Sequence, residues 1–239
     1  MEYAHCDTES VLVLWDIDHT LIETCGVGRA AFAAAFEQVT GRALEQMPHI
    51  TGRTEPDIYA ASAELHEIHR PPPFSVFADS LAAAYRARQD QLRRHGCVMP
   101  GAKDALTHLA GVYGVRQSVL TGNTRAVSRI KLETFGLHVF LDLETGAYGD
   151  DNGHRPELVS IAQSRATSRY ASEFDQRNTV LIGDSPGDIE TAVKGGAHII
   201  AVAAGGTPAS SLADADLILD DLTDAQAVAK AIHALVHTE

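Results

Sequence analysis

One stretch decides the fold of this chain: Val11-Leu12-Val13-Leu14-Trp15-Asp16-Ile17-Asp18-His19-Thr20-Leu21. Five successive apolar residues are followed directly by two acids spaced i and i+2. An uninterrupted apolar run that ends in polar residues is typical of a parallel strand buried on both faces. In open α/β sheets ligands bind beyond the carboxyl ends of such strands, and we expect Asp16 and Asp18 at that position.

Four further short apolar runs have the same character, and stretches with helical patterns lie between the later ones. Strand-like runs occupy residues 115–120, 179–182, 198–202 and 217–219, and helix-like stretches occupy 102–110, 124–135, 156–169 and 188–194. Alternation of strand and helix predicts right-handed crossovers and helices on both faces of the sheet. The fold class is therefore predicted as α/β, with a doubly wound, Rossmann-like parallel sheet.

Residues 23–95 have a different composition from the rest of the chain. They are rich in Ala, Glu, Arg and Gln, contain Pro71-Pro72-Pro73, and hold no strand-like run of comparable length. This pattern predicts an all-helical cap domain inserted after the first strand. The expected boundaries are 1–22 together with 96–239 for the core domain and 23–95 for the cap.

Charge limits the classes of partner. Nineteen Lys and Arg against 32 Asp and Glu give a formal net charge of −13, and 45% of the residues are hydrophobic. An acidic surface repels nucleic acid and anionic lipid, so we expect neither nucleic acid nor membrane as a main partner. An anionic substrate must then be met locally by a metal ion or by a few placed cations.

The cysteines and the apolar runs bear on localisation. Cys6, Cys25 and Cys97 are odd in number and lack the spacing of a zinc site or a disulfide framework, which favours idle thiols in a reducing compartment. The first apolar run is too short for a signal peptide, and none approaches the roughly 18 residues of a membrane span. These patterns predict a cytoplasmic protein.

Two more predicted strand ends carry polar groups. Thr121-Gly122-Asn123 precedes a helix, where a hydroxyl and free backbone amides can hold a phosphate, although a simple helix cap would look the same. Asp184 and Asp188 follow the run 179–182; Asp188 alone could be a favourable charge at a helix start, but an acid directly after a buried strand needs a partner such as a metal ion. Three such strand ends together indicate a catalytic site.

With these motifs the chain resembles the haloacid dehalogenase-like hydrolase superfamily, in particular phosphoglycolate phosphatase-like members with a helical (C1-type) cap. The resemblance implies that Asp16 is the nucleophile and that Asp18 is the general acid and base. It further implies that Thr121, the main-chain amide of Gly122, and Asn123 hold the phosphoryl group.

The resemblance also implies a Mg²⁺ cofactor. Its ligands would come from Asp16, the main-chain carbonyl of Asp18, and Asp184, while Asp188 would bind through water or orient its neighbours. Magnesium prefers oxygen ligands, usually one or two carboxylates with waters and phosphate oxygens, so this set of acids suits it.

The sequence departs from the family pattern at two positions. The family usually has a lysine between its second and fourth motifs, but Lys131 comes too early, on the helix after Thr121-Gly122-Asn123, and the next lysine is Lys194. Arg155, before Pro156, is the substitute we expect among the catalytic residues; Arg125 competes with it, and a surface role for Arg155 is the alternative. The second departure is His19, where the family commonly has glycine; it either fills a turn or alters access to the metal.

In the cap, the segment Ile50-Thr51-Gly52-Arg53-Thr54 resembles the substrate-selecting loop of capped family members. Arg53 would contact an anionic part of the substrate remote from the phosphate. The alternative is a helix cap with a solvated arginine.

These expectations combine into a function: a magnesium-dependent phosphatase that hydrolyses a small phosphomonoester, of the phosphoglycolate or sugar-phosphate type, through a phosphoryl-aspartate. The partner would be a small phosphorylated metabolite, and the protein a monomer or homodimer. A phosphomutase of the same fold and a non-catalytic phosphometabolite-binding protein are the alternatives.

Overall fold

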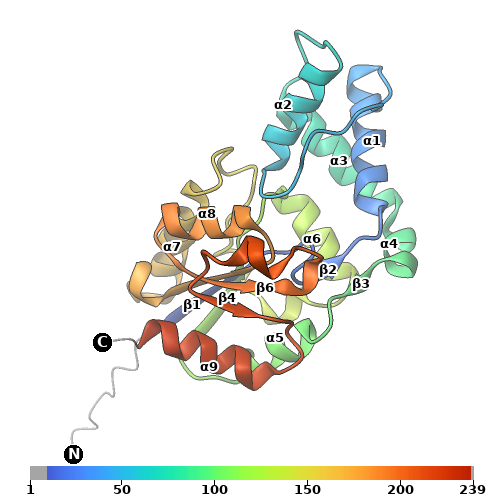
Figure 1. The fold of residues 1–239 in the computed structure, drawn as a ribbon. Coiled ribbons are helices and arrows are strands. Elements are labelled where there is room, and N and C mark those ends of the chain that lie inside the picture. Colours follow the sequence, from blue (N-terminus) through green and yellow to red (C-terminus); the bar gives the residue numbers. More distant parts are fainter. Residues whose placement is uncertain (1–9, 238–239) are drawn as a thin grey trace, which may run out of the picture.

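The computed structural model describes residues 10–237, and its main sheet confirms the predicted fold class. Five parallel strands lie in the order β4-β1-β5-β6-β7 (Figure 1). Each falls on one of the five apolar runs: β1 (Val11–Trp15), β4 (Val115–Val119), β5 (Thr179–Gly183), β6 (His198–Val202) and β7 (Leu217–Leu219).

Both faces of this sheet are covered by helices, which explains why β1 is apolar throughout. Val13 and Trp15 belong to a core that includes α5 (Ala102–Ala110) and α9 (Ala225–Val236). Leu12 and Leu14 point to the other face, in a core shared with α7 (Glu157–Tyr170) and α8 (Pro186–Gly195). Because successive side chains of a strand point to opposite faces, each face of β1 must supply its own apolar set.

The register of the three central strands brings the sequence motifs to one edge of the sheet. Trp15 of β1 pairs with Val119 of β4 and with Ile182 of β5. The residues that follow these three positions therefore leave the sheet at the same level, and they include Asp16, Thr121 and Asp184.

The region between the first two strands of the main sheet is helical, as predicted. It contains α1 (Val27–Thr40), α2 (Glu55–Leu65), α3 (Phe74–Ala87) and α4 (Gln89–His95), and α1 to α3 project away from the sheet (Figure 1). An antiparallel pair of two-residue strands, β2 (Ile22–Glu23) and β3 (Cys97–Val98), joins it to the rest. Two residues are too short to show a strand pattern in the sequence, so this ribbon was not predicted. Taking it as the border of a separate cap domain remains a proposal.

The projecting helices have their own aromatic core, and this core extends onto the sheet-bearing part of the chain. Phe77 packs edge-to-face on Phe32, with ring centroids 4.8 Å apart, and stacks on Tyr59 at 4.3 Å. The same cluster includes Val127 and Ile130 of α6 (Arg125–Thr134), the helix that follows β4. The cap helices therefore pack on α6.

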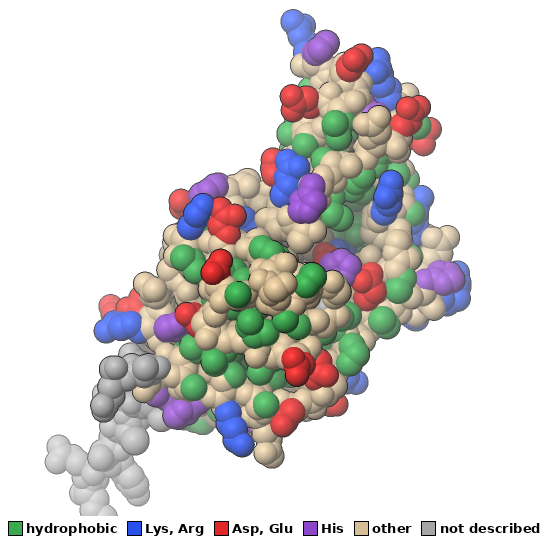
Figure 2. All heavy atoms as spheres, viewed as in Figure 1, with side chains coloured by type: hydrophobic (Ala, Val, Ile, Leu, Met, Phe, Trp, Pro, Cys, Tyr) green, Lys and Arg blue, Asp and Glu red, His purple; other side chains and the backbone are tan. Residues whose placement is uncertain are grey.

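Charged side chains of both signs (Figure 2) and two free cysteines lie on the described surface. Among the described helices none is both long and apolar enough to cross a membrane. Figure 2 shows basic and acidic side chains interspersed over the projecting helices. Cys25 and Cys97 are free and exposed, and Cys6 lies outside the described residues.

The aromatic core generates a prediction about stability. Phe77 is fully buried, whereas its neighbour Val76 is 48% exposed. Phe77→Ala should lower the free energy of unfolding by about 3–5 kcal/mol, because it leaves a cavity between three rings. Val76→Ala on the same helix should change it by less than about 0.5 kcal/mol. Urea unfolding of both variants measures this, and equal losses would contradict the packing described.

Candidate active site

A cavity of about 250 Å³ lies between the projecting helices and the carboxyl ends of the sheet strands. From the sheet side it is lined by Arg155 and by the residues that follow three strands: the first motif after β1 (Asp16, Asp18 and His19), the second after β4 (Thr121-Gly122-Asn123) and the fourth after β5 (Asp184 and Ser185). From the cap side it is lined by α1, the loop before α2, and Tyr85 of α3. All of the predicted site residues except Asp188 line this cavity, and Asp188 lies directly behind it against Arg155.

The first motif leaves the sheet through a tight turn. Asp16 extends β1, its amide donating to the carbonyl of Ile182 at 2.9 Å, and the amides of Leu21 and Ile22 then donate back to Ile17. His19 sits in this turn with φ of +66°. A left-handed residue is easiest for glycine, which gives a physical reason for the family preference at this position. In this chain the His19 ring contacts the Glu23 carboxylate of β2 at 2.6 Å.

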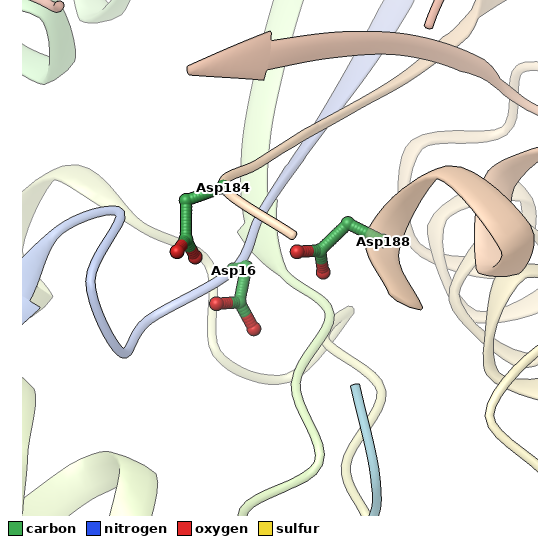
Figure 3. A group of neighbouring side chains, drawn as sticks. All are labelled: Asp16, Asp184 and Asp188. Carbon is green, nitrogen blue, oxygen red and sulfur yellow. The ribbon is translucent and has the colours of Figure 1, made fainter. Parts of the chain in front are cut away.

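Three carboxylates converge beside this turn. Asp16, Asp184 and Asp188 each offer an oxygen within 4.8 Å of the others, and Figure 3 shows them approaching from the end of β1, the end of β5 and the start of α8. Burial, then the neighbouring Asp188, raise the pKa of Asp16 well above its usual value. Burial and Asp188 likewise raise the pKa of Asp184 to about 6. Like charges held this close in a buried place destabilise one another unless a cation joins them.

Asp188 is held rigidly by its own helix start. Its Oδ2 accepts from the amide and the hydroxyl of Ser185, at 3.0 and 2.6 Å, and Ser185 Oγ in turn accepts from the Asp188 amide. The two residues form a capping box at the N-terminus of α8. Its remaining oxygen contacts Arg155, so Asp188 is equipped to orient its neighbours more than to offer a free ligand atom.

Arg155 occupies the place that the sequence assigned to it by analogy with the family lysine. Its Nη2 donates to Asp16 at 3.0 Å and to Asp188 at 2.5 Å, and its side chain is buried. Its Nε is buried without a hydrogen-bond partner among the described residues. The competing candidate, Arg125, instead pairs with Glu144 at 2.6 Å, near the surface.

The donor set fits a hard divalent cation. When all three carboxylates are ionised, the single guanidinium of Arg155 leaves two negative charges unbalanced in this part of the cavity, and a bound cation would offset them. All available donors are oxygens, the ligands that Mg²⁺ and Ca²⁺ prefer. The side chain of Asp18 is not part of this group, because it turns toward other partners.

The second motif supports Asp18. Asn123 donates through Nδ2 to Asp18 Oδ2 at 2.7 Å and to Thr121 Oγ1 at 2.8 Å. Thr121 is buried at the cavity wall, beside Gly122. The three residues therefore line the same cavity as Asp16, and Asn123 also holds Asp18, the residue that the resemblance identifies as general acid and base.

Lys131 is a site residue that the sequence motifs did not predict. Its ammonium lies 2.7 Å from both carboxylate oxygens of Asp18 and 2.7 Å from Asn123 Oδ1, and only 2% of the residue is exposed. Burial alone would raise the pKa of Asp18, but the charge and hydrogen bonds of Lys131, with Asn123, outweigh it and lower that pKa. A signal existed: Lys131 is four residues after Val127, on the buried face of α6.

The cap contributes two further buried polar residues near this lysine. Tyr85 of α3 places its ring 5.3 Å from the Lys131 ammonium. Glu55, at the start of α2, accepts a 2.6 Å hydrogen bond from the amide of Thr124 at the start of α6. Burial raises the pKa of Glu55 to about 7, against the lowering effect of Lys131 and Thr124. In the sequence, Glu55 looks like an ordinary acid at a helix start.

At the loop before α2, cap and core meet through backbone atoms. The Glu55 amide donates to the carbonyl of Gly122 at 2.8 Å. A Cβ on Gly122 would lie 2.1 Å from the carbonyl oxygen of Arg53, and one on Gly187 would lie 2.3 Å from Gly52 Cα. These close approaches require glycine, and they hold the cap loop directly over the second and fourth motifs.

Arg53 lines the cavity, as predicted for a substrate contact, but its guanidinium is already engaged. It contacts the Asp57 carboxylate at 2.5 Å, and its Nη1 donates to the carbonyl of His49 at 3.1 Å. This arrangement fits the alternative reading, in which an arginine near the start of a helix pairs with an acid one helical turn later. Whether Arg53 also contacts substrate stays a prediction.

Comparison with known proteins places the fold among solved structures. The model of the haloacid dehalogenase-like hydrolase family matches residues 13–192. CbbY from Rhodobacter sphaeroides, solved in complex with phosphate, aligns with TM-score 0.69 and 19% identity over 90% of this chain and 96% of its own. A "predicted phosphoglycolate phosphatase" from Haemophilus somnus aligns with TM-score 0.63 and 17% identity, over 92% and 98%. β-Phosphoglucomutase from Clostridium difficile aligns with TM-score 0.69 and 12% identity, over 97% of this chain and 100% of its own. No curated protein matches the chain.

The buried Glu55 generates a prediction about pH. Unfolded, Glu55 loses its proton near 4.5, whereas in the folded protein it keeps the proton up to a pKa of about 7. The unfolded state therefore binds fewer protons in this window, and stability falls as pH rises through it. Relative to Glu55→Gln, the wild type should lose on the order of 2 kcal/mol of unfolding free energy between about pH 5 and about pH 8.

Denaturant unfolding of both proteins at each pH measures the difference between their free energies of unfolding. The other acidic residues are the same in both proteins, so their contributions cancel in this difference. A difference that is constant with pH would contradict the burial of Glu55.

Proposed function

The chain belongs to the haloacid dehalogenase-like hydrolase family, and on this premise we propose that it is a phosphatase that hydrolyses small phosphomonoesters with Asp16 as nucleophile. One observation carries the proposal. Arg155 holds Asp16 at the cavity wall and keeps a second buried donor, Nε, without a partner among the described residues. A buried unpaired donor beside a nucleophile suits an oxygen of a bound phosphoryl group.

In the first step, one oxygen of Asp16 attacks phosphorus while the bond from phosphorus to the leaving oxygen breaks. The leaving oxygen takes a proton from Asp18, and the phosphoryl group remains on Asp16 as an acyl phosphate. Arg155 and Thr121 hold the phosphoryl oxygens during this transfer. Phosphoryl transfer depends mostly on such positioning and charge neutralisation.

In the second step, a water attacks the phosphoryl-aspartate, Asp18 accepts the water's proton, and the carboxylate of Asp16 is restored as phosphate leaves. The first step requires Asp18 in its protonated form and the second step requires it ionised; Lys131 beside Asp18 lowers its pKa and so favours the form that the second step requires. A Mg²⁺ ion held by Asp16 and Asp184, with the Asp18 carbonyl and with Asp188 behind them, would supply the positive charge that the crowded carboxylates and the phosphoryl group share.

The small volume of the cavity, about 250 Å³, favours compact substrates, and its cations suggest which group the far end of the substrate carries. Four Lys and Arg side chains line it. Arg155, Lys131 and Arg53 each pair with a carboxylate. The side chain of Arg29, exposed on the first turn of α1, makes no hydrogen bond or ion pair with any described residue. We therefore assign to Arg29, ahead of Arg53, the recognition of a second anionic group such as the carboxylate of phosphoglycolate.

A phosphomutase is the second candidate function, because a mutase needs the same two acids and β-phosphoglucomutase shares the fold. The two functions differ in what accepts the phosphoryl group from Asp16, water or a second substrate hydroxyl. Product analysis with a sugar phosphate separates them, since only the phosphatase releases inorganic phosphate.

The proposal predicts Mg²⁺-dependent release of inorganic phosphate from small phosphomonoesters. Asp16→Asn should reduce turnover at least about 10³-fold, because the amide cannot act as the nucleophile, while the far-UV circular dichroism stays unchanged. Phosphate release is measured over a panel of sugar phosphates, phosphoglycolate and p-nitrophenyl phosphate, with and without Mg²⁺. Turnover that persists in Asp16→Asn would remove Asp16 as nucleophile.

The assignment of Arg29 predicts a selective loss. Phosphoglycolate and 2-hydroxyethyl phosphate differ only in a carboxylate against a hydroxymethyl group. Arg29→Gln should lower kcat/KM for phosphoglycolate about 10- to 100-fold, the worth of one charged hydrogen bond, and for 2-hydroxyethyl phosphate less than about threefold. Arg53→Gln is the matched variant; a larger selective loss in it would return the role to Arg53.

A further inference from the structure

Lys131 is a buried cation whose position the family pattern does not explain. Arg155 already stands where the family lysine is expected, at Asp16. Lys131 reaches the other catalytic candidate: its ammonium is 2.7 Å from each oxygen of Asp18. The site thus holds two buried cations, one for each acid of the first motif.

The contacts of Lys131 fix more than one side chain. The ammonium donates to Asn123 Oδ1 at 2.7 Å, and Asn123 donates to the same oxygen of Asp18 that Lys131 contacts. Lys131, Asn123 and Asp18 therefore form a closed triangle, in which the amide of Asn123 can have only one orientation. The triangle specifies where the Asp18 carboxylate lies relative to the cavity.

The cap completes the surroundings of this lysine. Tyr85 lies over it at 5.3 Å, and Glu55 shares the buried space between α2 and α6. Only 3% of the Lys131 side chain is exposed, compared with 36% for that of Asp18. The lysine is thus fixed on the protein side, and the acid that it holds remains open to the cavity.

We propose that Lys131 is the positioning residue for Asp18: it holds the Asp18 carboxylate, directly and through Asn123, in the orientation from which it acts on the leaving oxygen and on water. This role rests on the proposed phosphatase function. It also explains why a buried lysine is placed on a mostly apolar helix face, where an unpaired charge would be unfavourable.

The experiment is a double-mutant cycle on kcat with p-nitrophenyl phosphate, whose leaving group needs little protonation, so that Asp18→Asn keeps measurable activity. Lys131→Met should lower kcat about 10- to 100-fold and change KM less than about threefold. In the Asp18→Asn background the same substitution should cause no further loss beyond about twofold, because it acts through Asp18. Lys194→Met, an exposed lysine paired with Glu190, is the matched control and should match the wild type.

Losses that multiply in the double variant, or an unchanged kcat in Lys131→Met, would overturn this role while the wild type remains active. A wild type inactive on every phosphomonoester would overturn the phosphatase function and this role together. Circular dichroism checks each fold. If Lys131→Met does not fold, the same test can be made with two other variants. Lys131→Gln keeps a hydrogen-bond donor for Asn123, and Lys131→Met/Glu55→Gln removes one buried acid together with the buried cation.

Discussion

The site depends on the balance between buried carboxylates and two buried cations. Asp16, Asp184 and Asp188 lie close enough to repel one another, and Arg155 pairs with two of them. Asp18, from the same strand end, is turned to a separate cation, Lys131. The two neighbouring acids therefore occupy different electrostatic surroundings: the pKa of Asp16 is raised by burial, and the pKa of Asp18 is lowered by Lys131. A nucleophile must be ionised, so the raised pKa of Asp16 has to be offset, and a cation bound between Asp16 and Asp184 would favour the ionised form of Asp16.

The sheet makes this balance possible. Parallel register between β1, β4 and β5 carries three loops to one edge, so that residues more than a hundred positions apart in the chain share one cavity. Helix starts then hold the groups in place: Ser185 fixes Asp188, and Thr124 caps α6, the helix that supplies Lys131. The main-chain geometry, more than individual packing contacts, sets the positions of the acids.

Much of this could be predicted from the sequence, because it follows from local pattern. The five apolar runs form the five strands of the main sheet, and the motifs that follow β1, β4 and β5 line one cavity. Arg155 was expected near Asp16 and lies there, although its role in catalysis stays a prediction. Lys131, Glu55 and Tyr85 were not predicted, since their significance comes from cap–core contacts between distant segments. The β2–β3 ribbon was too short to leave a pattern.

The glycine contacts between the cap loop and the core have a consequence for how such a protein can change over time. Gly52, Gly122 and Gly187 meet their partners through main-chain atoms, so closure makes little demand on cap side chains. The exposed cap residues that line the cavity, such as Arg29, Ile50 and Thr51, can then vary without disturbing how the two parts meet. Selection for a new substrate can then change the cap side of the cavity alone, while the catalytic residues at the strand ends stay the same.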